Sequence, residues 1–466
     1  MGGECATPAC FLLFCEAGLE ALVAADARRA CGRAGLAGAQ LRLDTSPCGD
    51  GFVGAVGVSH ADAEGLKAAL LQLRSCHYIA QRHFVLDVPP AAAAAEGEPE
   101  LPLRALEQRL EALLPAREVA VPSLEGAKSF RVTGWRTGKA RREREARHRQ
   151  TGMRRRRQCL LRRRCTYCLS GALTPSHIRA QAHAFNSGEL AIIVGGCLAD
   201  QYPACKPKMR GYDAHVRADV VGRRLCVSTQ LHEEPLSRRH KAAYLNKVTI
   251  KASVAYVMLT QAGLPSDGSG SVMDPFCGSG TILLEALDAG LATVAYGADA
   301  NTQAVKGTLA NAEAAGFAQG VHAERADVAG ALYTVPKGTL VDAVVSNPPW
   351  GVQTGKGADL KTMYRAFLKT AWQLLKPGGR LVVLVLRGFL FLDVVRAFAS
   401  ASGTFRVVDT VVTKTRNNLP TIVVLEKDEG GDPELRKLRD RLRFLQQYCD
   451  MSPSSHKELF TGVGFK

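Results

Sequence analysis

The run Asn347-Pro348-Pro349-Trp350 combines residue types that suit chemistry on a flat amine. It follows the apolar run Val341–Val345, which predicts a buried strand that ends in a rigid corner. Proline fixes φ and lacks an N–H, so the carbonyls ahead of it stay free to accept hydrogen bonds. An amide, these carbonyls and an aromatic face can hold an exocyclic amine and stack on its ring. The alternative is an ordinary loop after a strand.

A glycine-containing turn supplies a second candidate site. Residues 274–281 read DPFCGSGT and join an expected strand to an expected helix. Gly278 and Gly280 let the backbone approach a ligand closely, and the helix N-terminus offers unpaired N–H groups. The pattern is not GxGxxG, and no Lys follows as in a P-loop. A ligand with a carboxylate and a nucleoside but no pyrophosphate fits better, and S-adenosylmethionine is such a ligand.

Three acidic residues end successive expected strands, at Asp274, Asp299 and Asp327. The carboxyl ends of parallel strands meet at one edge of the sheet, where ligands bind. Asp299 suits the two ribose hydroxyls, and Asp327 suits the adenine amine. The residues predicted to be catalytic are Asn347, Pro348 and Trp350. The residues predicted to bind the cofactor are Thr249, Asp274, Phe276, Cys277, Gly278, Gly280, Thr281, Asp299, Ala300, Asp327, Val328 and Asn347.

The elements that must position these residues alternate between strand and helix. Strands are expected at 272–276, 293–298, 321–326, 341–346, 380–386, 405–414 and 421–427. Helices are expected at 248–262, 279–289, 302–315 and 360–375. This alternation predicts a doubly wound, mostly parallel α/β sheet. The closing hairpin, around 416–420, favours a methyltransferase sheet over a dehydrogenase sheet.

The first ninety residues have a different rhythm, with strands expected at 10–15, 52–59 and 78–88 and helices at 18–34 and 62–73. This pattern predicts a ferredoxin-like α+β unit. Residues 89–100 resemble a linker. Beyond it, a helix is expected at 101–114, a strand at 129–138, a helix from 183 to 198 capped by Asn186 or Ser187, and strands at 213–220 and 224–230.

Length and charge limit the class of protein. A chain of 466 residues with 46% hydrophobic residues indicates two or three globular domains, and we find no apolar run of about 20 residues that could span a bilayer. The N-terminus lacks a basic n-region, so we expect no signal peptide and read the fourteen cysteines as reduced thiols. The net charge of +16 favours a polyanionic partner such as RNA or DNA.

One segment, residues 139–182, carries most of that charge, with a sum of +12. It lacks periodicity, and we interpret it as an insertion or a flexible basic arm, which need not have a specific partner. It contains Cys165-x-x-Cys168 together with Cys159 and His177. A single CxxC without a second spaced pair is weak evidence for zinc, and no metal site is predicted.

The combination of DPFCGSGT with NPPWG resembles the methyltransferases that act on exocyclic amines of nucleobases. Upstream, FLLFCEAGLEALV at 11–23, FRVTGWRTG at 130–138, HAFNSGEL at 183–190, YDAHVRADV at 212–220 and PLSRRH at 235–240 resemble landmarks of a THUMP domain and its ferredoxin-like neighbour. The chain is therefore similar to the THUMP-containing RNA guanosine-N2 methyltransferases of archaeal and eukaryotic type. The resemblance covers most of the chain except 139–182, where the family pattern runs from Gly138 to His183. A second departure is NPPW, where some eukaryotic relatives have Asp-x-Pro-Phe.

The resemblance implies an S-adenosylmethionine-dependent, class I methyltransferase that acts on guanine N2 in structured RNA, either tRNA or small nuclear RNA, in the cytoplasm or nucleus. It implies four parts: a ferredoxin-like domain at 1–90, a THUMP domain at 91–234 with the insertion, a Rossmann-fold methyltransferase domain at 235–430, and a C-terminal helix and tail at 431–466. It also implies a small zinc-binding activator protein as partner. The candidate RNA contacts are Arg131, Arg136, Lys206, Lys208, Arg210, Arg238 and Arg239.

Other functions fit the same corner. NPP-aromatic serves equally for adenine N6, for a guanine of ribosomal RNA and for the glutamine amide of a protein. An RNA-binding scaffold with an inactive methyltransferase fold is a further alternative, which Asp274, Gly278, Gly280, Asp299 and Asn347 disfavour because all are present.

Overall fold

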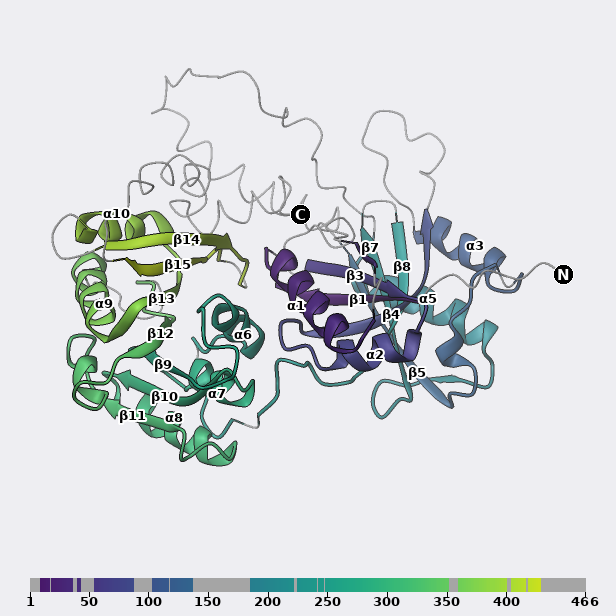
Figure 1. Ribbon diagram of the computed structural model, residues 1–466. Coiled ribbons are helices and arrows are strands. Elements are labelled where there is room, and N and C mark those ends of the chain that lie inside the picture. The colour runs from purple at the N-terminus through teal and green to yellow at the C-terminus, as the bar shows by residue number, and fades with distance from the viewer. Residues whose placement is uncertain are drawn as a thin grey trace, which may run out of the picture.

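The computed structural model contains two β-sheets, each with helices packed against it (Figure 1). It describes residues 9–36 except 17, 40–42, 54–87, 103–136 except 117, 185–351 except 222, 223, 241 and 247, 359–399, 404–415 and 418–428. The expected linker, the basic segment and the C-terminal helix and tail lie outside the described residues.

The first elements form a βαββαβ unit. They are β1 (Ala9–Cys15), α1 (Glu20–Arg33), β2 (Gln40–Arg42), β3 (Gly54–His60), α2 (Ala63–Leu71) and β4 (Tyr78–Asp87). The strand order is β2-β3-β1-β4 with antiparallel pairing. Asp62 caps α2 by accepting a hydrogen bond from the Gly65 N–H at 2.8 Å. The expected ferredoxin-like unit is confirmed, and β2 is the strand that sequence analysis missed.

Strand β4 also pairs with β8, so the sheet continues into the next part of the chain. That part comprises α3 (Leu103–Leu113), η1 (Pro122–Leu124), β5 (Ser129–Arg136), α5 (Ser187–Gln201), β6 (Lys206–Pro207), β7 (Ala214–Val221) and β8 (Arg224–Gln230). Asn186 and Glu189 form a capping box at the start of α5, which selects Asn186 as the N-cap. Because the sheet is continuous, the proposed boundary at residue 90 does not coincide with a break in it and stays a prediction.

The second sheet has seven strands in the order β11-β10-β9-β12-β13-β15-β14. Its strands are β9 (Gly270–Asp274), β10 (Ala292–Asp299), β11 (Val321–Arg325), β12 (Val341–Ser346), β13 (Leu375–Val385), β14 (Thr404–Val412) and β15 (Thr421–Asp428). Its helices are α6 (Ala252–Thr260), α7 (Thr281–Asp288), α8 (Thr302–Ala314), η3 (Gly330–Thr334), α9 (Leu360–Leu374) and α10 (Gly388–Ala399). Strands β9 to β13 pair in parallel, and β15 runs antiparallel to both neighbours. The expected doubly wound sheet with a closing hairpin is confirmed.

Two elements differ from expectation. The helix expected at 248–262 begins later, at Ala252, because the Asn246 side chain accepts hydrogen bonds from the Val248 N–H and the Thr249 hydroxyl and holds that stretch in a turn. Helix α10 was not predicted. Its sequence GFLFLDVVRAFA has only two charged residues, Asp393 and Arg396, so its exposed face carries few of the polar residues by which a surface helix is recognised.

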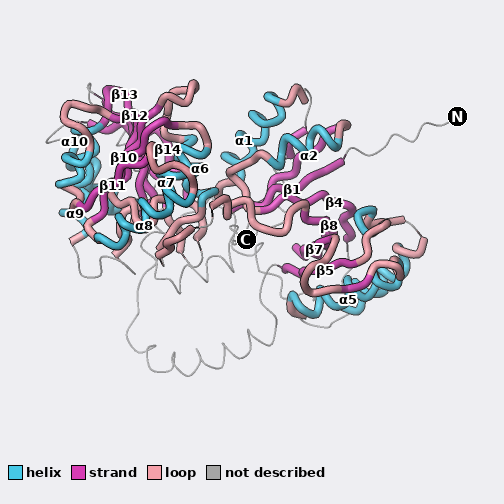
Figure 2. Tube along the Cα trace, turned by 90° about the horizontal axis from the view of Figure 1, so that it is seen from below, coloured by secondary structure: helices cyan, strands magenta, loops and turns pink. Residues whose placement is uncertain are grey.

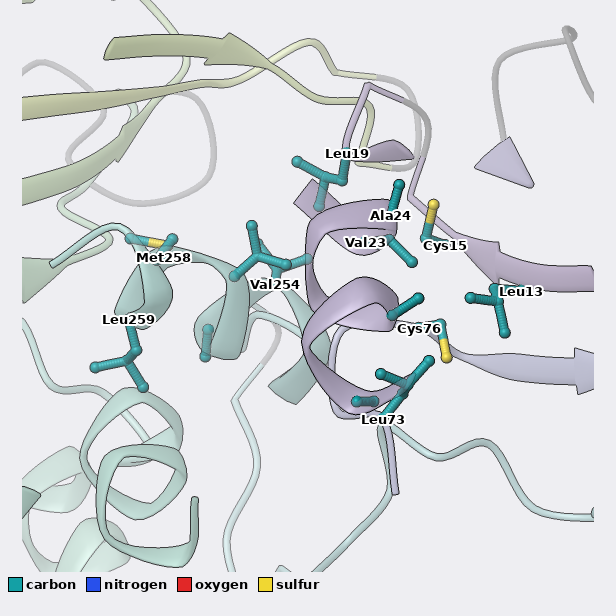
Figure 3. Packing of buried hydrophobic residues seen from close by; sticks show 14 of the residues in the cluster. Leu13, Cys15, Leu19, Val23, Ala24, Leu73, Cys76, Val254, Met258 and Leu259 are labelled. Atoms are coloured by element: carbon teal, nitrogen blue, oxygen red, sulfur yellow. The ribbon is translucent and has the colours of Figure 1, made fainter. Parts of the chain in front are cut away.

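The two sheets are joined through α1 and α6, which lie next to each other in both views (Figures 1 and 2). A single hydrophobic core contains Leu19 and Val23 from the first half together with Val254 and Met258 from α6 (Figure 3). Among the described helices, none is both long and apolar enough to cross a bilayer.

Candidate active site

The candidate site lies where the order of the second sheet reverses. Strand β9 has β10 on one side and β12 on the other. The loops that follow β9 and β12 therefore leave the same edge of the sheet in opposite directions. In doubly wound sheets this switch point forms the ligand crevice. Both sequence motifs lie there, because DPFCGSGT follows β9 and NPPWG follows β12.

The glycine turn after β9 is held in a shape that requires glycine. Gly278 and Gly280 have φ of +58° and +79°, in the left-handed region. A Cβ at Gly280 would lie 2.8 Å from the Thr308 methyl carbon. Gly280 is the N-cap of α7, so the first N–H groups of that helix face the turn. This backbone is suited to close approach by a carboxylate.

Side chains of α8 fix the same turn from behind. The Thr308 hydroxyl donates to the Gly278 carbonyl at 3.0 Å, and the Asn311 amide donates to the Ser279 carbonyl at 2.8 Å. Thr308 and Asn311 are almost fully buried. Neither residue was predicted from the sequence. The available signal was two polar residues, three apart, on the buried face of an otherwise ordinary helix.

The predicted residue Thr249 lies against this turn, since its hydroxyl oxygen is 3.0 Å from that of Ser279. Tyr244 extends the contact, because its backbone N–H donates to Asn311 and its carbonyl accepts from Asn311, each at 2.8 Å. The segment before α6 therefore packs along the glycine turn. Thr281, also predicted, is half-buried at the start of α7.

Asp299 links the end of β10 to the glycine turn. One carboxylate oxygen accepts from the Gly278 N–H at 3.1 Å, and the other accepts from the Asn301 N–H at 2.8 Å. The side chain is half-buried and Ala300 is exposed. A carboxylate has about four acceptor positions, so Asp299 keeps capacity for the hydroxyls of a ribose.

The third acid, Asp327, is exposed after β11 and accepts from the Gly330 N–H at 2.7 Å. Val328 follows it, half-buried, with its carbonyl held by the Thr370 hydroxyl at 2.8 Å. Phe276 is half-buried and packs edge-on against Phe367, with ring centroids 5.4 Å apart.

Asp274, at the end of β9, is fully enclosed. One carboxylate oxygen accepts from the Ser346 hydroxyl at 2.6 Å and from the Phe276 N–H at 3.0 Å. Burial raises the pKa of Asp274 to about 7, although both hydrogen bonds lower it. Cys277 is buried beside it, and burial raises the pKa of its thiol, so it is no nucleophile. The Ser346 hydroxyl thus links the glycine turn to the corner after β12.

At that corner, Asn347 is half-buried and its side-chain oxygen is enclosed without a hydrogen-bond donor among the described residues. Buried acceptors in folded proteins are almost always paired, so this oxygen is suited to a donor supplied by a ligand. Pro348 is buried, and Trp350 is half-buried with its indole N–H donating to the Leu384 carbonyl at 3.1 Å. The indole is thereby held in one orientation beside the corner.

The candidate RNA contacts do not all share one surface. Lys206, Lys208 and Arg210 are exposed around the edge strand β6, and Arg131 on the adjacent β5 lies over the Tyr212 ring at 5.9 Å. Arg136 belongs to β5, and its side chain is outside the described residues. These positions form a basic edge around β6, the last strand of the first sheet. Strands β8, β7 and β5 separate β6 from β4.

Arg238 and Arg239 lie elsewhere, in the turn that precedes the second half. Arg238 is exposed and pairs with Glu234 at 3.1 Å. The Arg239 side chain is only 13% exposed and pairs with Glu285 at 3.2 Å, and its contact with RNA stays a prediction. No group of three His, Cys, Asp or Glu side chains with metal-binding geometry occurs within the described ranges, and Cys165 and Cys168 lie outside them.

Comparisons with known proteins agree with this geometry. Residues 239–415 match the model of the UPF0020 family, described as RMKL-like, methyltransferase domain. A curated relative, the tRNA (guanine(6)-N2)-methyltransferase of Thermus thermophilus, is 34% identical over 213 residues, which are 45% of this chain and 60% of that protein. The U6 snRNA (guanine-N(2))-methyltransferase THUMPD2 of Bos taurus is 26% identical over 206 residues, covering 44% of this chain and 38% of that protein. The chain thus spans less than two thirds of the length of these curated relatives.

Among solved structures, TrmN from Thermus thermophilus superposes with a TM-score of 0.63 at 25% identity, covering 90% of this chain and 99% of that one. The family match lies on the second sheet, and the structural match extends over both sheets. The expected α/β fold with a Rossmann-like class I methyltransferase domain is therefore confirmed, and residues 239–415 of this chain are similar to the RMKL-like methyltransferase domains.

Proposed function

We propose that this protein is an S-adenosylmethionine-dependent RNA methyltransferase that methylates the exocyclic N2 amine of a guanosine. The observation that carries the proposal is the enclosed side-chain oxygen of Asn347 at the corner beside the glycine turn, which has no hydrogen-bond donor in the part of the chain that the structure describes. The names of the relatives support it, since they describe guanine-N2 methylation of tRNA and of U6 snRNA. The methyltransferase-domain match supports the reaction type.

The residues around the glycine turn fit the cofactor. The turn at Gly278 and Gly280, with the N-terminus of α7 behind it, would hold the methionyl carboxylate. Asp299 would hold the ribose hydroxyls with the acceptor positions that Gly278 and Asn301 leave unused. Asp327 would receive the adenine amine. When bound, S-adenosylmethionine supplies an electrophilic methyl group on its sulfonium.

The corner after β12 would orient the acceptor. The guanine N2 lone pair is delocalised into the ring, so the amine is a poor nucleophile until its hydrogens are held. We assign this to the Asn347 oxygen and the Pro348 carbonyl as acceptors, with Trp350 stacking on the base. These acceptors gain strength as positive charge develops on N2, which is binding that favours the transition state. With the amine held by these acceptors, its N–C bond would form as the S–C bond of the cofactor breaks, and the proton that leaves N2 would pass to solvent.

The first sheet would bind the RNA. We propose that residues 91–234 are a THUMP domain and that Arg131, Lys206, Lys208 and Arg210 contact phosphates of a structured RNA end. The target base then leaves its stack to enter the corner. An RNA substrate of the tRNA or small nuclear RNA class supports a cytoplasmic or nuclear location.

A protein partner belongs to the same proposal. The family resemblance supports pairing with a small zinc-binding activator protein, docked on an edge of the methyltransferase sheet, of which β11 and β14 are the edge strands. Co-expression with such a protein should yield a co-purifying complex, and independent migration of the two would remove this part of the proposal.

The substrate class is tested by competition between polymers. The protein is incubated with labelled S-adenosylmethionine and a mixture of total RNA and total cell protein, and the label is counted after digestion with ribonuclease or with protease. We expect ribonuclease to release the label. Release by protease instead would identify a protein amide as the acceptor, and absence of label with measurable cofactor binding would favour the inactive-scaffold alternative.

A further inference from the structure

A buried carboxylate joins the two halves of the molecule directly behind the cofactor turn. Glu285 lies on α7, and its side chain is completely buried. One of its oxygens accepts from the Arg74 guanidinium at 2.7 Å, and the other accepts from the Arg239 guanidinium at 3.2 Å. Arg74 follows α2 in the ferredoxin-like unit, and Arg239 lies in the connection between the halves. Three distant parts of the chain therefore meet at one carboxylate.

The charges around Glu285 balance. Arg74 also pairs with Asp288 at the end of α7 and donates to the Asp288 backbone carbonyl at 3.3 Å. Arg239 donates in addition to the Arg74 carbonyl. Two guanidinium groups thus face two carboxylates, and loss of one member would leave a poorly hydrated charge without a partner. We call Arg74, Arg239, Glu285 and Asp288 the α7 clamp.

The α7 clamp acts on the helix whose N-terminus forms the cofactor turn. Helix α7 has only eight residues, from Thr281 to Asp288, so Glu285 is about one helical turn from Thr281. The hydrogen bonds that Thr308 and Asn311 donate to the Gly278 and Ser279 carbonyls fix the turn at the N-terminal end of α7. The clamp fixes its other end to the ferredoxin-like unit. A short rigid helix therefore connects the RNA-binding half to the cofactor turn.

Further contacts hold the ferredoxin-like unit against α6. Ser253 lies 3.0 Å from the His77 ring, and the Tyr256 hydroxyl donates to the buried Asp26 at 3.2 Å. Between these polar contacts, Val23 and Leu73 share one hydrophobic core with Val254 and Met258 of α6 (Figure 3). Packed interfaces of this kind resist sliding because their side chains interdigitate.

The loop before α1 also meets the closing hairpin of the second sheet. Gly18 has φ of +92°, and a Cβ there would lie 2.0 Å from the Val412 carbonyl oxygen. Only glycine permits this approach. The ferredoxin-like unit is thus fixed at three places: at α7, along α6 and at β14.

From this arrangement we propose that Glu285 is a positioning residue for RNA methylation. It holds the RNA-binding half at one orientation to the Asn347 corner, so that an RNA docked on the basic edge around β6 delivers its target guanosine to the corner. This inference rests on the proposed function. It requires that replacing Glu285 slow the transfer of methyl to RNA without weakening the binding of the cofactor or of the RNA.

The test compares two isosteric substitutions. Glu285→Gln removes the buried charge, and Glu313→Gln makes the same change at an exposed glutamate on the neighbouring helix α8. Calorimetry measures the cofactor Kd, filter binding measures the RNA Kd, and labelled cofactor measures kcat/KM on the same RNA. We expect Glu285→Gln to lower kcat/KM at least about 10-fold while both Kd values stay within about two-fold of wild type. Glu313→Gln should match wild type in all three.

Two results would overturn the inference. One is a folded Glu285→Gln protein with the kcat/KM of Glu313→Gln. The other is a cofactor Kd weakened as much as kcat/KM, which would mean a local effect on α7. If Glu285→Gln does not fold, Arg74→Lys gives the same readout, because it keeps the charge but loses the two-pronged guanidinium contact.

Hydrogen exchange separates failure of this inference from failure of the proposed function. If wild type labels no RNA, the proposed function is wrong, but the α7 clamp is still tested by exchange at α1 and α6. We expect faster deuterium uptake in peptides from both helices in Glu285→Gln than in Glu313→Gln. Equal uptake in the two variants would show that Glu285 does not hold the halves together.

Discussion

At the scale of single residues, the proposed function depends on one oxygen atom that has no hydrogen-bond donor among the described residues. The Asn347 side-chain oxygen is enclosed at the end of β12, next to Ser346, whose hydroxyl donates a hydrogen bond to Asp274. Leaving a buried acceptor unpaired costs free energy, which a substrate amine would recover by donating to it. This is the residue at which cofactor binding and methyl transfer should be separable.

Asn347→Ala should therefore lower methyl transfer by about 10²–10³-fold while the cofactor Kd stays near that of wild type. Asn347→Asp keeps an acceptor oxygen and should retain much more activity than the alanine variant. Single-turnover transfer and calorimetry give the two quantities. Equal loss of cofactor binding and methyl transfer in Asn347→Ala would contradict the role assigned to this side chain.

A second residue-scale prediction concerns Asp274. Its pKa of about 7 in the folded protein lies above the usual value of about 3.9 in an unfolded chain, so the folded state binds the extra proton. Its contribution to stability is fully present below about pH 4 and is lost as the pH rises through about 7, with a full size on the order of 4 kcal/mol. Asp274→Asn should remove this loss.

Thermal unfolding of the cofactor-free protein at about pH 5 and about pH 8 measures this pH-dependent loss of stability. Wild type should lose more Tm between the two pH values than Asp274→Asn. The exposed Asp267 offers a matched control, because Ser269 lowers the pKa of that carboxyl and it therefore titrates below this range. Asp267→Asn should behave as wild type, and an Asp274→Asn protein with the wild-type pH dependence would refute the raised pKa.

At the scale of elements, two glycines lie at opposite ends of α7. Alanine variants of the two can distinguish the effect of backbone strain from the effect of a changed binding site. Gly280 and Gly290 both have positive φ, at +79° and +64°. A Cβ at Gly280 would press on Thr308, whereas a Cβ at Gly290 meets nothing within 4 Å. Both alanine variants should lose about 1–2 kcal/mol to the left-handed conformation. Only Gly280→Ala should also weaken the cofactor Kd, by about 10-fold or more, because the turn must shift.

Calorimetry of the two variants decides this prediction. Gly280→Ala with wild-type cofactor affinity would exclude the turn from the binding site. Gly290→Ala with weakened affinity would mean that strain anywhere in α7 is enough to disturb the cofactor.

The elements also show how far the sequence alone could reach. Strands β9, β10 and β12 were predictable because buried parallel strands are continuous apolar runs that end in conspicuous polar residues. Helix α10 was missed because only Asp393 and Arg396 interrupt its apolar sequence, and the start of α6 was misplaced because the Asn246 side chain accepts hydrogen bonds from a local N–H and a local hydroxyl. Hydrophobic patterns indicate which face of a segment is buried. They do not reveal a single side chain that forms hydrogen bonds with the local backbone in place of the helix.

The same limit applies within the site. The acids, glycines and NPPW were recognisable from residue type and spacing. Thr308 and Asn311 hold the glycine turn from another helix, and a contact between segments some thirty residues apart leaves no local pattern. Arg239 looked like a surface charge in a basic turn, and only the three-dimensional structure shows its buried partner, Glu285.

At the scale of the whole molecule, the two halves should divide the work of binding. The basic edge around β6 lies on the first sheet, and the cofactor turn lies on the second. Replacing Lys206, Lys208 and Arg210 together by Gln should weaken RNA binding and reduce the salt dependence of log K by about two to three in slope, with the cofactor Kd unchanged.

A matched triple variant controls for net charge. Lys361, Arg365 and Lys369 are exposed on α9, in the second half. Their replacement by Gln removes the same charge and should leave the RNA Kd within about two-fold of wild type, because electrostatic attraction to phosphates is local at physiological salt. Equal weakening by both triple variants would mean that the +16 net charge, and not the β6 edge, attracts the RNA.

The identity of the methylated atom tests the proposed function most directly. The protein, with and without a candidate activator, is incubated with total RNA and labelled S-adenosylmethionine, and the RNA is digested to nucleosides and separated by chromatography with mass detection. We expect label in N2-methylguanosine, reduced about 10²–10³-fold when Asn347 is replaced by Ala. Label in N6-methyladenosine, with none in N2-methylguanosine, would contradict it.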